Sequence, residues 1–407
     1  MKRSFLFLQG PSTPFFWQLA KRLLSLGHAV HRINFCAGDA LFWPHRATRY
    51  SVQLAGLPAF LDEIYSRYGI TDQILFGDRR PVHRPAIDHG QACDIRTHVF
   101  EEGYFRPWWI TLEREGVNGH SLLPRDPDWF RQEGKRLIDD NSATAFTSPF
   151  FMRAYYDVLY HLAGAANPVF FPDYRNHAGI SAPIEYAGYV RRFSWLRLHG
   201  ANERQRAMTI AKKRGKFYLL PLQLNTDAQI RDHSSFEHMG EVIDYVLASF
   251  ARNAPTDCRI VIKNHPLDIG LMNYAAIIRE CETRYGLAGR IEYLEDGDLL
   301  ALAMNARGVV TVNSTVGIIS LEQNIPTTTL SDPIYNLPGL TAQIPLDQFW
   351  QHGEVPDEML FRCFRRCVMK ATQINGGFYS NPGLTLAVEN SAQVLTAKLS
   401  PLELMTC

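Results

Sequence analysis

The chain has 407 residues, of which 46% are hydrophobic and 20% are charged, and its formal net charge is +1. This composition is typical of a globular chain with room for two domains, and it excludes a largely disordered protein. A net charge near zero argues against general binding to nucleic acid, and we expect no such partner. An anionic ligand would have to be met by a local group of side chains.

The seven cysteines are irregularly spaced. Cys363 and Cys367 lie four residues apart, but no second pair or histidine cluster completes a zinc site around them. We therefore expect buried, reduced thiols, which are typical of the cytosol.

The amino terminus does not read as a targeting segment. The apolar run at residues 5–8 is too short for a signal peptide, and no run approaches the roughly 18 apolar residues that suggest a membrane span. We expect a cytoplasmic protein that is soluble or peripheral on the inner membrane.

The first half of the chain opens with a strand, helix, strand pattern. A strand is predicted at 5–8, a helix at 14–26 and a second strand at 29–35, separated by turns at Gly10 and Gly27. This pattern indicates a parallel sheet. Further strands are predicted at 74–77 and 98–100, and a helix at 155–162.

Residues 191–216 hold nine lysines and arginines against a single acid, Glu203, and are interpreted as an interdomain helix or linker. After them strands and helices alternate regularly, as in an open, doubly wound sheet. The predicted strands are 217–222, 259–263, 291–294, 308–312 and 327–330, and the helices between them are 236–250, 271–285, 299–305 and 316–323.

The fold prediction is α/β, of the GT-B type, with two Rossmann-like domains whose parallel sheets face a central cleft. We place the acceptor-side domain at 1–200, the donor-binding domain at 201–385 and a tail at 386–407. The sequence lacks both G-x-G-x-x-G after the first strand and G-x-x-x-x-G-K-[ST], so dinucleotide oxidoreductase and P-loop ATPase are disfavoured.

Paired acids follow one predicted strand of the first half. Glu101 and Glu102 precede Gly103, and one carboxylate could take a proton from an attacking hydroxyl. The alternative is a solvated loop with an ion pair to Arg106.

Polar groups also follow three predicted strands of the second half. Gln223 and Asp227 follow the first, and Asp227 is a candidate nucleophile for a covalent glycosyl intermediate or else a helix cap. Lys263 and His265 end the second, where they could meet a phosphate, although a purely structural histidine is equally plausible. The third is followed by a turn that could form an anion nest or a plain helix cap, made by Asn313, Ser314 and Thr315.

Basic and aromatic side chains suggest contact with a lipid. The basic run Lys212, Lys213 and Arg214 could meet anionic head groups, each contributing roughly 1 kcal/mol near a membrane. Arg106 and Trp108 are candidates on the acceptor side. The alternatives are a solvated helical face for the basic run and core packing for the tryptophan.

Paired acids followed by His-Pro and a Ser/Thr turn are similar to the motif set of bacterial sialyltransferases with the GT-B fold. Longer strings resemble the KpsS-type capsule polysaccharide proteins, over about residues 5–385. These strings are 7–11, 32–36, 76–78, 100–107, 116–119, 221–223, 265–268, 311–317, 335–341 and 375–379.

This resemblance implies a retaining β-Kdo transferase. Its donor would be CMP-β-Kdo, and its acceptor a (lyso)phosphatidylglycerol-type lipid or a short Kdo linker on it, so that the product starts the poly-Kdo linker of a capsular polysaccharide. It implies Asp227 as nucleophile, Glu102 as the favoured base and His265 as a phosphate ligand, without a metal or cofactor. Asn264 departs from the basic or histidine residue expected before His265.

Two other functions stay open. One is an inverting CMP-sugar transferase of the sialyltransferase kind, with a glutamate as base and no covalent step. The other is a non-catalytic capsule assembly or export subunit. Other capsule assembly or export proteins are possible partners in each case.

Overall fold

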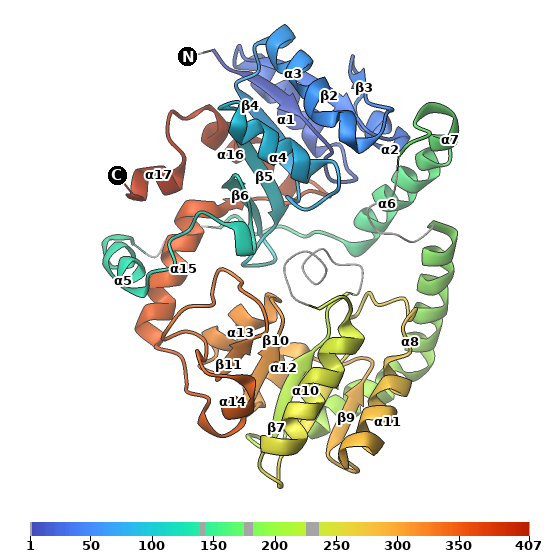
Figure 1. Cartoon of the computed structure of the whole chain (residues 1–407), viewed down its shortest axis with the longest axis vertical. Helices are drawn as coiled ribbons and strands as arrows, with labels where there is room; N and C mark the ends of the chain where they lie inside the picture. The colour runs from blue at the N-terminus through green and yellow to red at the C-terminus, as the bar shows by residue number, and fades with distance from the viewer. Residues whose placement is uncertain (1, 139–142, 175–181, 225–235, 407) are drawn as a thin grey trace. The chain divides into compact units, whose positions relative to one another are not determined.

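The computed structural model describes residues 2–138, 143–174, 182–224 and 236–406. The chain forms two compact units, each built on its own β-sheet (Figure 1). The first unit comprises residues 1–124, 133–177 and 365–407, and the second comprises residues 125–132 and 178–364. The predicted α/β class is confirmed, as are the two Rossmann-like domains that a GT-B chain requires. The central cleft stays a prediction.

The sheet of the first unit has seven strands in the order β12-β6-β5-β4-β1-β2-β3. Strands β1 to β5 are parallel, whereas β6 runs antiparallel to both β5 and β12. The strands are β1 (Ser4–Phe7), β2 (Ala29–Asn34), β3 (Thr48–Arg49), β4 (Asp72–Phe76), β5 (Arg96–Glu102), β6 (Trp109–Arg114) and β12 (Gln373–Asn375).

Helices cover both faces of this sheet, and β1 shows why. Its side chains alternate: Phe5 and Phe7 join a core with helices α1 (Phe15–Ser25) and α16 (Gly383–Thr396), whereas Leu6 and Leu8 join a core with α3 (Leu57–Tyr68) and α4 (His83–Ala92). A parallel strand buried on both faces reads as a continuous apolar run, as residues 5–8 do.

Shorter elements complete the first unit. Helix α6 packs on α2, where a Cβ on Gly38 would come within 2.5 Å of the Tyr160 ring, so that only glycine allows this approach. The elements are α2 (Ala37–Leu41), α6 (Phe150–Gly164), α7 (Asn167–Phe170), α17 (Pro401–Thr406) and the 3-10 turns η1 (Leu54–Gly56) and η2 (Asn118–His120).

The sheet of the second unit has five parallel strands in the order β11-β10-β7-β8-β9. They are β7 (Phe217–Pro221), β8 (Arg259–Lys263), β9 (Ile291–Leu294), β10 (Gly308–Thr311) and β11 (Thr327–Thr329). Each lies within a residue or two of a predicted strand, because short apolar runs bounded by turn residues are typical of such strands.

Helices also flank both faces of the second sheet. Tyr218 and Leu220 share a core with α10, α11 and α14, whereas Phe217 and Leu219 share one with α8 and α12. The helices are α8 (Ala182–Ala211), α10 (Met239–Asn253), α11 (Tyr274–Tyr285), α12 (Leu299–Asn305), α13 (Val316–Glu322) and α14 (Leu346–His352).

The limits of the two units differ from the predicted domain limits. All of α8 belongs to the second unit, because Ala207 and Ile210 lie in the core that α12 covers. The segment after residue 364 returns to the first unit, because β12 pairs with β6 and α16 packs on α1. Two of the points at which the chain passes between the units fall within helices, α5 (Pro127–Arg136) and α15 (Glu358–Thr372).

Candidate functional site

The second sheet has a topological switch point between β7 and β10. The chain passes from β7 outward to β8 and β9, and then returns to β10 on the other side of β7. Open α/β sheets bind ligands at the carboxyl ends of the strands at such a point. Gln223 follows β7 and Asn313 follows β10, so the two residues flank this position.

Gln223 and Asn313 are buried and joined by two hydrogen bonds. The Gln223 side-chain nitrogen donates to Asn313 Oδ1 at 2.9 Å, and the Asn313 backbone N–H donates to Gln223 Oε1 at 3.2 Å. Two of the predicted donor-binding residues are therefore brought together. Asp227, the predicted nucleophile, lies outside the described residues.

His265 follows β8, which is the neighbour of β7 in the sheet. Its Nδ1 accepts a hydrogen bond from the backbone N–H of Leu267 at 3.1 Å, and its own backbone N–H donates to Asn264 Oδ1 at 2.8 Å. An imidazole whose Nδ1 accepts carries its proton on Nε2. The half-buried ring thus has the tautomer that a phosphate-binding histidine needs.

Lys263 ends β8 and is buried. Its Nζ donates to the carbonyl oxygen of Asn264 at 2.9 Å. Burial lowers the pKa of the Lys263 ammonium, while Asp296 acts in the opposite direction. The Lys263 ammonium is therefore held at the carboxyl end of β8 and is shielded from solvent.

Asn264, the residue that departs from the expected pattern, bridges two carboxylates. Its side-chain nitrogen donates to Asp268 Oδ2 at 3.2 Å and to Glu295 Oε2 at 2.9 Å, and Arg192 forms an ion pair with Glu295. Burial raises the pKa of the Asp268 carboxyl against the opposing hydrogen bonds from Asn264 and Gly270. The amide thus fixes the loop that carries His265.

The predicted anion nest at Ser314 and Thr315 begins α13. Ser314 Oγ accepts the backbone N–H of Val316 at 3.3 Å, so its hydroxyl acts as a helix cap, whereas the Thr315 side chain makes no capping hydrogen bond. The Tyr335 hydroxyl donates to the Ser314 carbonyl at 2.6 Å. Gly317 is required here, because a Cβ would lie about 2.4 Å from the Tyr335 hydroxyl.

The paired acids of the first unit lie within a strand, not in the predicted loop. β5 extends through Glu102, because Glu101 and Glu102 pair with Thr111 and Ile110 of the antiparallel strand β6. The prediction ended this strand too early, since neither acid has a high strand propensity. Gly103 allows the hairpin to close, because a Cβ there would lie 2.2 Å from a backbone oxygen of the facing strand.

Glu102 has two partners on other elements of the first unit. The Tyr379 hydroxyl donates to Glu102 Oε1 at 2.9 Å, and an Arg153 guanidinium nitrogen lies 3.5 Å from the same oxygen. Arg153 also lies over the Tyr379 ring. Burial, together with Glu102, raises the pKa of Tyr379, so the phenol keeps its proton and donates.

Glu101 has a different role. Its Oε1 accepts the backbone N–H of Glu102 at 2.9 Å. Glu102 forms an ion pair with Arg153, whereas Arg106, the partner suggested by the sequence, donates to the carbonyl of Gly103 at 3.4 Å. Side chains from other elements thus hold Glu102 in place.

A buried polar cluster at the carboxyl ends of β1 and β2 was not predicted as part of a site. Arg32 forms an ion pair with Asp39 at 3.2 Å, and the Gln9 side-chain nitrogen lies 3.3 Å from Asp39 Oδ2 and 3.1 Å from the Tyr160 hydroxyl. The available signals were Gln9, which follows β1 within the string 7–11, and Arg32, a charged residue in β2 within the string 32–36. The contribution of Tyr160, on α6, has no local sequence signal.

The predicted lipid-contacting groups lie on different elements. Arg106 and Trp108 are exposed beside the β5–β6 hairpin, with the Trp108 indole N–H donating to the carbonyl of Phe146 at 3.2 Å. The basic run follows α8 and precedes β7, so it lies at the amino edge of the second sheet, at the opposite end of β7 from Gln223. All three of its members are exposed: Lys212, Lys213 and Arg214.

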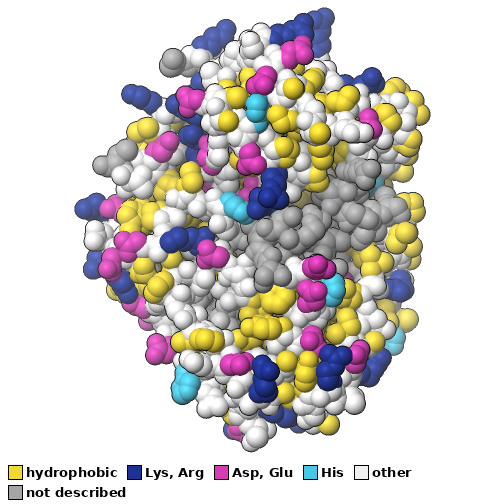
Figure 2. Space-filling model, in the orientation of Figure 1, with side chains coloured by type: hydrophobic (Ala, Val, Ile, Leu, Met, Phe, Trp, Pro, Cys, Tyr) yellow, Lys and Arg dark blue, Asp and Glu magenta, His cyan; other side chains and the backbone are white. Residues whose placement is uncertain are grey.

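Helix α6 has an exposed apolar stripe. Its members recur at helical spacing, and α7 continues the exposed surface with two more apolar side chains. Figure 2 shows hydrophobic side chains at the surface in the region where Figure 1 draws α7. The exposed residues are Phe150, Phe151, Tyr155, Val158 and Leu162 on α6, and Val169 and Phe170 on α7.

The fold and the site together define a protein with two Rossmann-like domains, each of which carries polar side chains able to bind a ligand at the carboxyl edge of its sheet. The chain belongs to the capsule polysaccharide biosynthesis protein family, whose model matches residues 71–379.

Curated relatives match nearly the whole chain. It is 36% identical to the capsule polysaccharide modification protein LipB of Neisseria meningitidis serogroup B over 386 residues, which cover 92% of this chain and 91% of the relative. It is 37% identical to the capsule polysaccharide export protein KpsS of Escherichia coli over 383 residues, covering 93% and 97% of the two chains. The chain is thus a capsule polysaccharide protein of the KpsS/LipB type.

The solved structures that match this chain have a much lower sequence identity than the curated relatives. The β-Kdo 2,7-transferase of Thermosulfurimonas dismutans KpsC matches at 12% identity with a TM-score of 0.45, covering 96% of this chain and 99% of that one. A UDP-GlcNAc 2-epimerase of Methanocaldococcus jannaschii matches at 12% identity with a TM-score of 0.31, covering 97% and 99%.

Proposed function

We propose that this chain is a retaining glycosyltransferase that moves Kdo from CMP-β-Kdo to a (lyso)phosphatidylglycerol-type lipid. The product would start the poly-Kdo linker of a capsular polysaccharide. Membership of the capsule family and the resemblance of residues 5–385 to the KpsS type support the substrate class.

The observation that carries the proposal is the constellation at the switch point of the second sheet. Gln223 and Asn313 are locked together after adjacent strands, and the next strand, β8, presents His265 as an Nε2–H donor. Such a set can receive a phosphate-bearing nucleotide through N–H donors. We therefore assign CMP-sugar binding to this edge.

In the first chemical step, a carboxylate oxygen of Asp227 forms a bond to the anomeric carbon of Kdo. The bond from that carbon to the phosphate oxygen breaks, and CMP leaves with the electron pair. His265 Nε2–H and the hydroxyl of Thr315, which does not cap α13, stabilise the charge on the departing phosphate. CMP carries a single phosphate, so we propose that transfer needs no divalent metal.

In the second step, the acceptor hydroxyl displaces Asp227 from the anomeric carbon. Its proton passes to Glu102, which accepts from Tyr379 and pairs with Arg153 and is thereby held in one orientation. Two inversions at the same carbon retain the anomeric configuration.

The apolar stripe on α6 supports a lipid acceptor. A row of exposed aromatic and aliphatic side chains on one helix face is typical of a surface that meets another apolar surface. No helix in the described ranges is long and apolar enough to span a bilayer. We propose that α6 and α7 rest on the inner membrane, where the acceptor is found.

The direct test is to incubate the purified protein with CMP-β-Kdo and a synthetic lysophosphatidylglycerol. We expect CMP release that depends on the acceptor, a product heavier by one Kdo residue and a β-linkage by NMR. A full-length, folded preparation that releases no CMP with either lipid or Kdo-primed lipid would contradict a transferase and favour an assembly or export subunit.

Mass spectrometry of the intact protein with donor alone separates the retaining route from the inverting one. A Kdo-sized adduct on wild type that is lost in Asp227→Asn supports the covalent step. Near-normal transfer by Asp227→Asn would remove this residue from the nucleophile role.

A further inference from the structure

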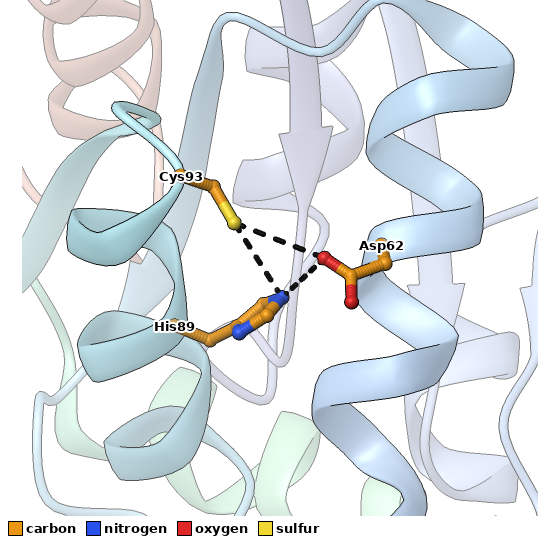
Figure 3. Close-up of side chains that lie close together, drawn as sticks. All are labelled: Asp62, His89 and Cys93. Atoms are coloured by element: carbon orange, nitrogen blue, oxygen red, sulfur yellow. Dashed lines mark hydrogen bonds and ion pairs between the residues drawn. The ribbon is translucent and has the colours of Figure 1, made fainter.

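Three metal-ligating side chains converge on the outer face of the first unit (Figure 3). Asp62 comes from α3, His89 from α4, and Cys93 from the position that ends α4. His89 Nε2 lies 2.7 Å from Asp62 Oδ1, and Cys93 Sγ lies 3.6 Å from His89 Nε2 and 3.8 Å from Asp62 Oδ1. Asp62 and Cys93 are exposed, and His89 is half-buried.

Both neighbours of the imidazole approach the same nitrogen. In a nucleophile relay the carboxylate binds one ring nitrogen and the thiol meets the other. Here the thiol and the carboxylate both meet Nε2, so the three ligand atoms surround one point in space. That arrangement is the one a bound cation requires.

We propose that Asp62, His89 and Cys93 bind one zinc ion, with solvent as the fourth ligand. Zinc bonds of about 2.3 Å to sulfur and about 2.0–2.2 Å to nitrogen and oxygen place tetrahedral ligand atoms roughly 3.3–3.6 Å apart. The two distances from Cys93 Sγ, to His89 Nε2 and to Asp62 Oδ1, come within a few tenths of an ångström of this range. The distance between Asp62 Oδ1 and His89 Nε2 has to increase by about 0.6 Å, which rotation of the exposed carboxylate can provide.

The chain prepares this site in two ways. His89 and Cys93 lie four residues apart, on successive turns of the helix, and the His89 ring stacks on Tyr65 of α3 at a centroid distance of 6.0 Å. The other cysteines that the structure describes are all buried, so they do not compete for the ion in the folded protein.

The site would hold α3 to α4 and take no part in sugar transfer. α4 runs from the carboxyl end of β4 to the amino end of β5, so Cys93 lies near the amino end of the strand whose other end carries Glu102. Cysteine binds zinc as the thiolate, so the apparent affinity should fall as the pH is lowered.

The test uses the full-length, chelator-treated protein and two metals. Zinc affinity is measured by competition with a chromophoric chelator, and cobalt(II) is added as a spectroscopic probe. We expect one zinc per chain and a thiolate-to-cobalt charge-transfer band. Cys93→Ser should lose the band, and both Cys93→Ser and His89→Gln should weaken zinc binding by more than the roughly 10–100-fold typical of changes to outer-shell partners.

Asp88→Asn is the matched control, because it removes an exposed carboxylate of the same helix that is not one of the three ligands. It should keep both the band and the affinity. Zinc should also raise the thermal midpoint of wild type but not of Cys93→Ser, since a ligand that binds only the folded state stabilises it. Equal zinc affinity in wild type and Cys93→Ser, with both folded by circular dichroism, would overturn the proposal.

Discussion

Gln223 and Asn313 lie 90 residues apart and hold each other through two hydrogen bonds across the switch point of the second sheet. The backbone N–H and the side-chain oxygen of Asn313 are both engaged by a single glutamine side chain. Because the glutamine follows β7 and the asparagine follows β10, this pair fixes the carboxyl ends of two adjacent strands relative to each other.

Replacing Gln223 with leucine should damage both folding and donor binding. Two buried hydrogen bonds are lost, and the free energy of unfolding should fall by about 1–3 kcal/mol. CMP binding, measured by calorimetry, should weaken as well. Gln205→Leu, an exposed glutamine on α8, is the control and should change neither quantity. If the free energy of unfolding of Gln223→Leu in urea equalled that of wild type, the pair would not stabilise the two strand ends.

The roles of the two ring nitrogens of His265 can be separated by substitution. Asparagine can accept the Leu267 N–H as Nδ1 does but has no group at the Nε2 position, whereas glutamine can place an N–H donor there. We expect CMP affinity to fall in the order wild type, His265→Gln, His265→Asn. The reverse order of the two variants in calorimetry would mean that His265 serves only to shape its loop.

The strands of the second unit could be predicted from the sequence because each carries a short run of mainly apolar residues, and β7 and β10 are buried throughout. Residues 259–263 and 291–294 coincide with β8 and β9. The position of His265 could be predicted for the same reason, since polar residues at strand ends gather at one edge. The orientation of its ring could not, because it depends on a hydrogen bond to the backbone of Leu267.

Other features depend on contacts that are distant in sequence. Nothing around Glu102 indicates Tyr379, which is 277 residues away. The return of β12 to pair with β6 gives only a three-residue strand, so the predicted domain limits could not anticipate it. Cys93 was expected to be buried and is exposed, because it ends α4 beside the exposed Asp62.

Glu102→Gln should abolish most transfer without loss of the fold. Removing a general base typically costs about 10²–10⁴-fold in rate, and CMP binding should be unaffected because the change lies in the other unit. Glu101→Gln is the matched comparison, since its amide oxygen can still accept the Glu102 N–H. A larger loss of transfer rate in Glu101→Gln than in Glu102→Gln would exchange the two roles.

The buried carboxyl of Asp268 should make the free energy of unfolding depend on pH. Burial raises its pKa above the ordinary 3.8, so the folded state holds this proton more tightly than the unfolded state does. The stabilisation is complete below pH 3.8 and is lost as the pH rises through the raised value. In Asp268→Asn the amide oxygen can still accept from Asn264, and no proton is involved.

The difference in unfolding free energy between wild type and Asp268→Asn should therefore shift in favour of the variant as the pH rises from 3.8 towards neutrality. Urea unfolding of both proteins over this range measures it. A difference that stays constant, or that moves towards wild type, would show that the Asp268 pKa is not raised in the folded protein.

Membrane contact through α6 predicts a loss of vesicle binding when the stripe is broken by charge. Fully burying a phenylalanine side chain is worth about 1.5–3 kcal/mol, so Phe151→Asp should weaken sedimentation with phosphatidylglycerol vesicles by about tenfold or more. Transfer to a short-chain, water-soluble acceptor should be unchanged, because Phe151 is exposed and has no part in the chemistry. Leu404→Asp on α17, which is exposed outside the stripe, is the control. If both variants lost vesicle binding equally, the attraction would depend on overall charge, and α6 would not be the contact surface.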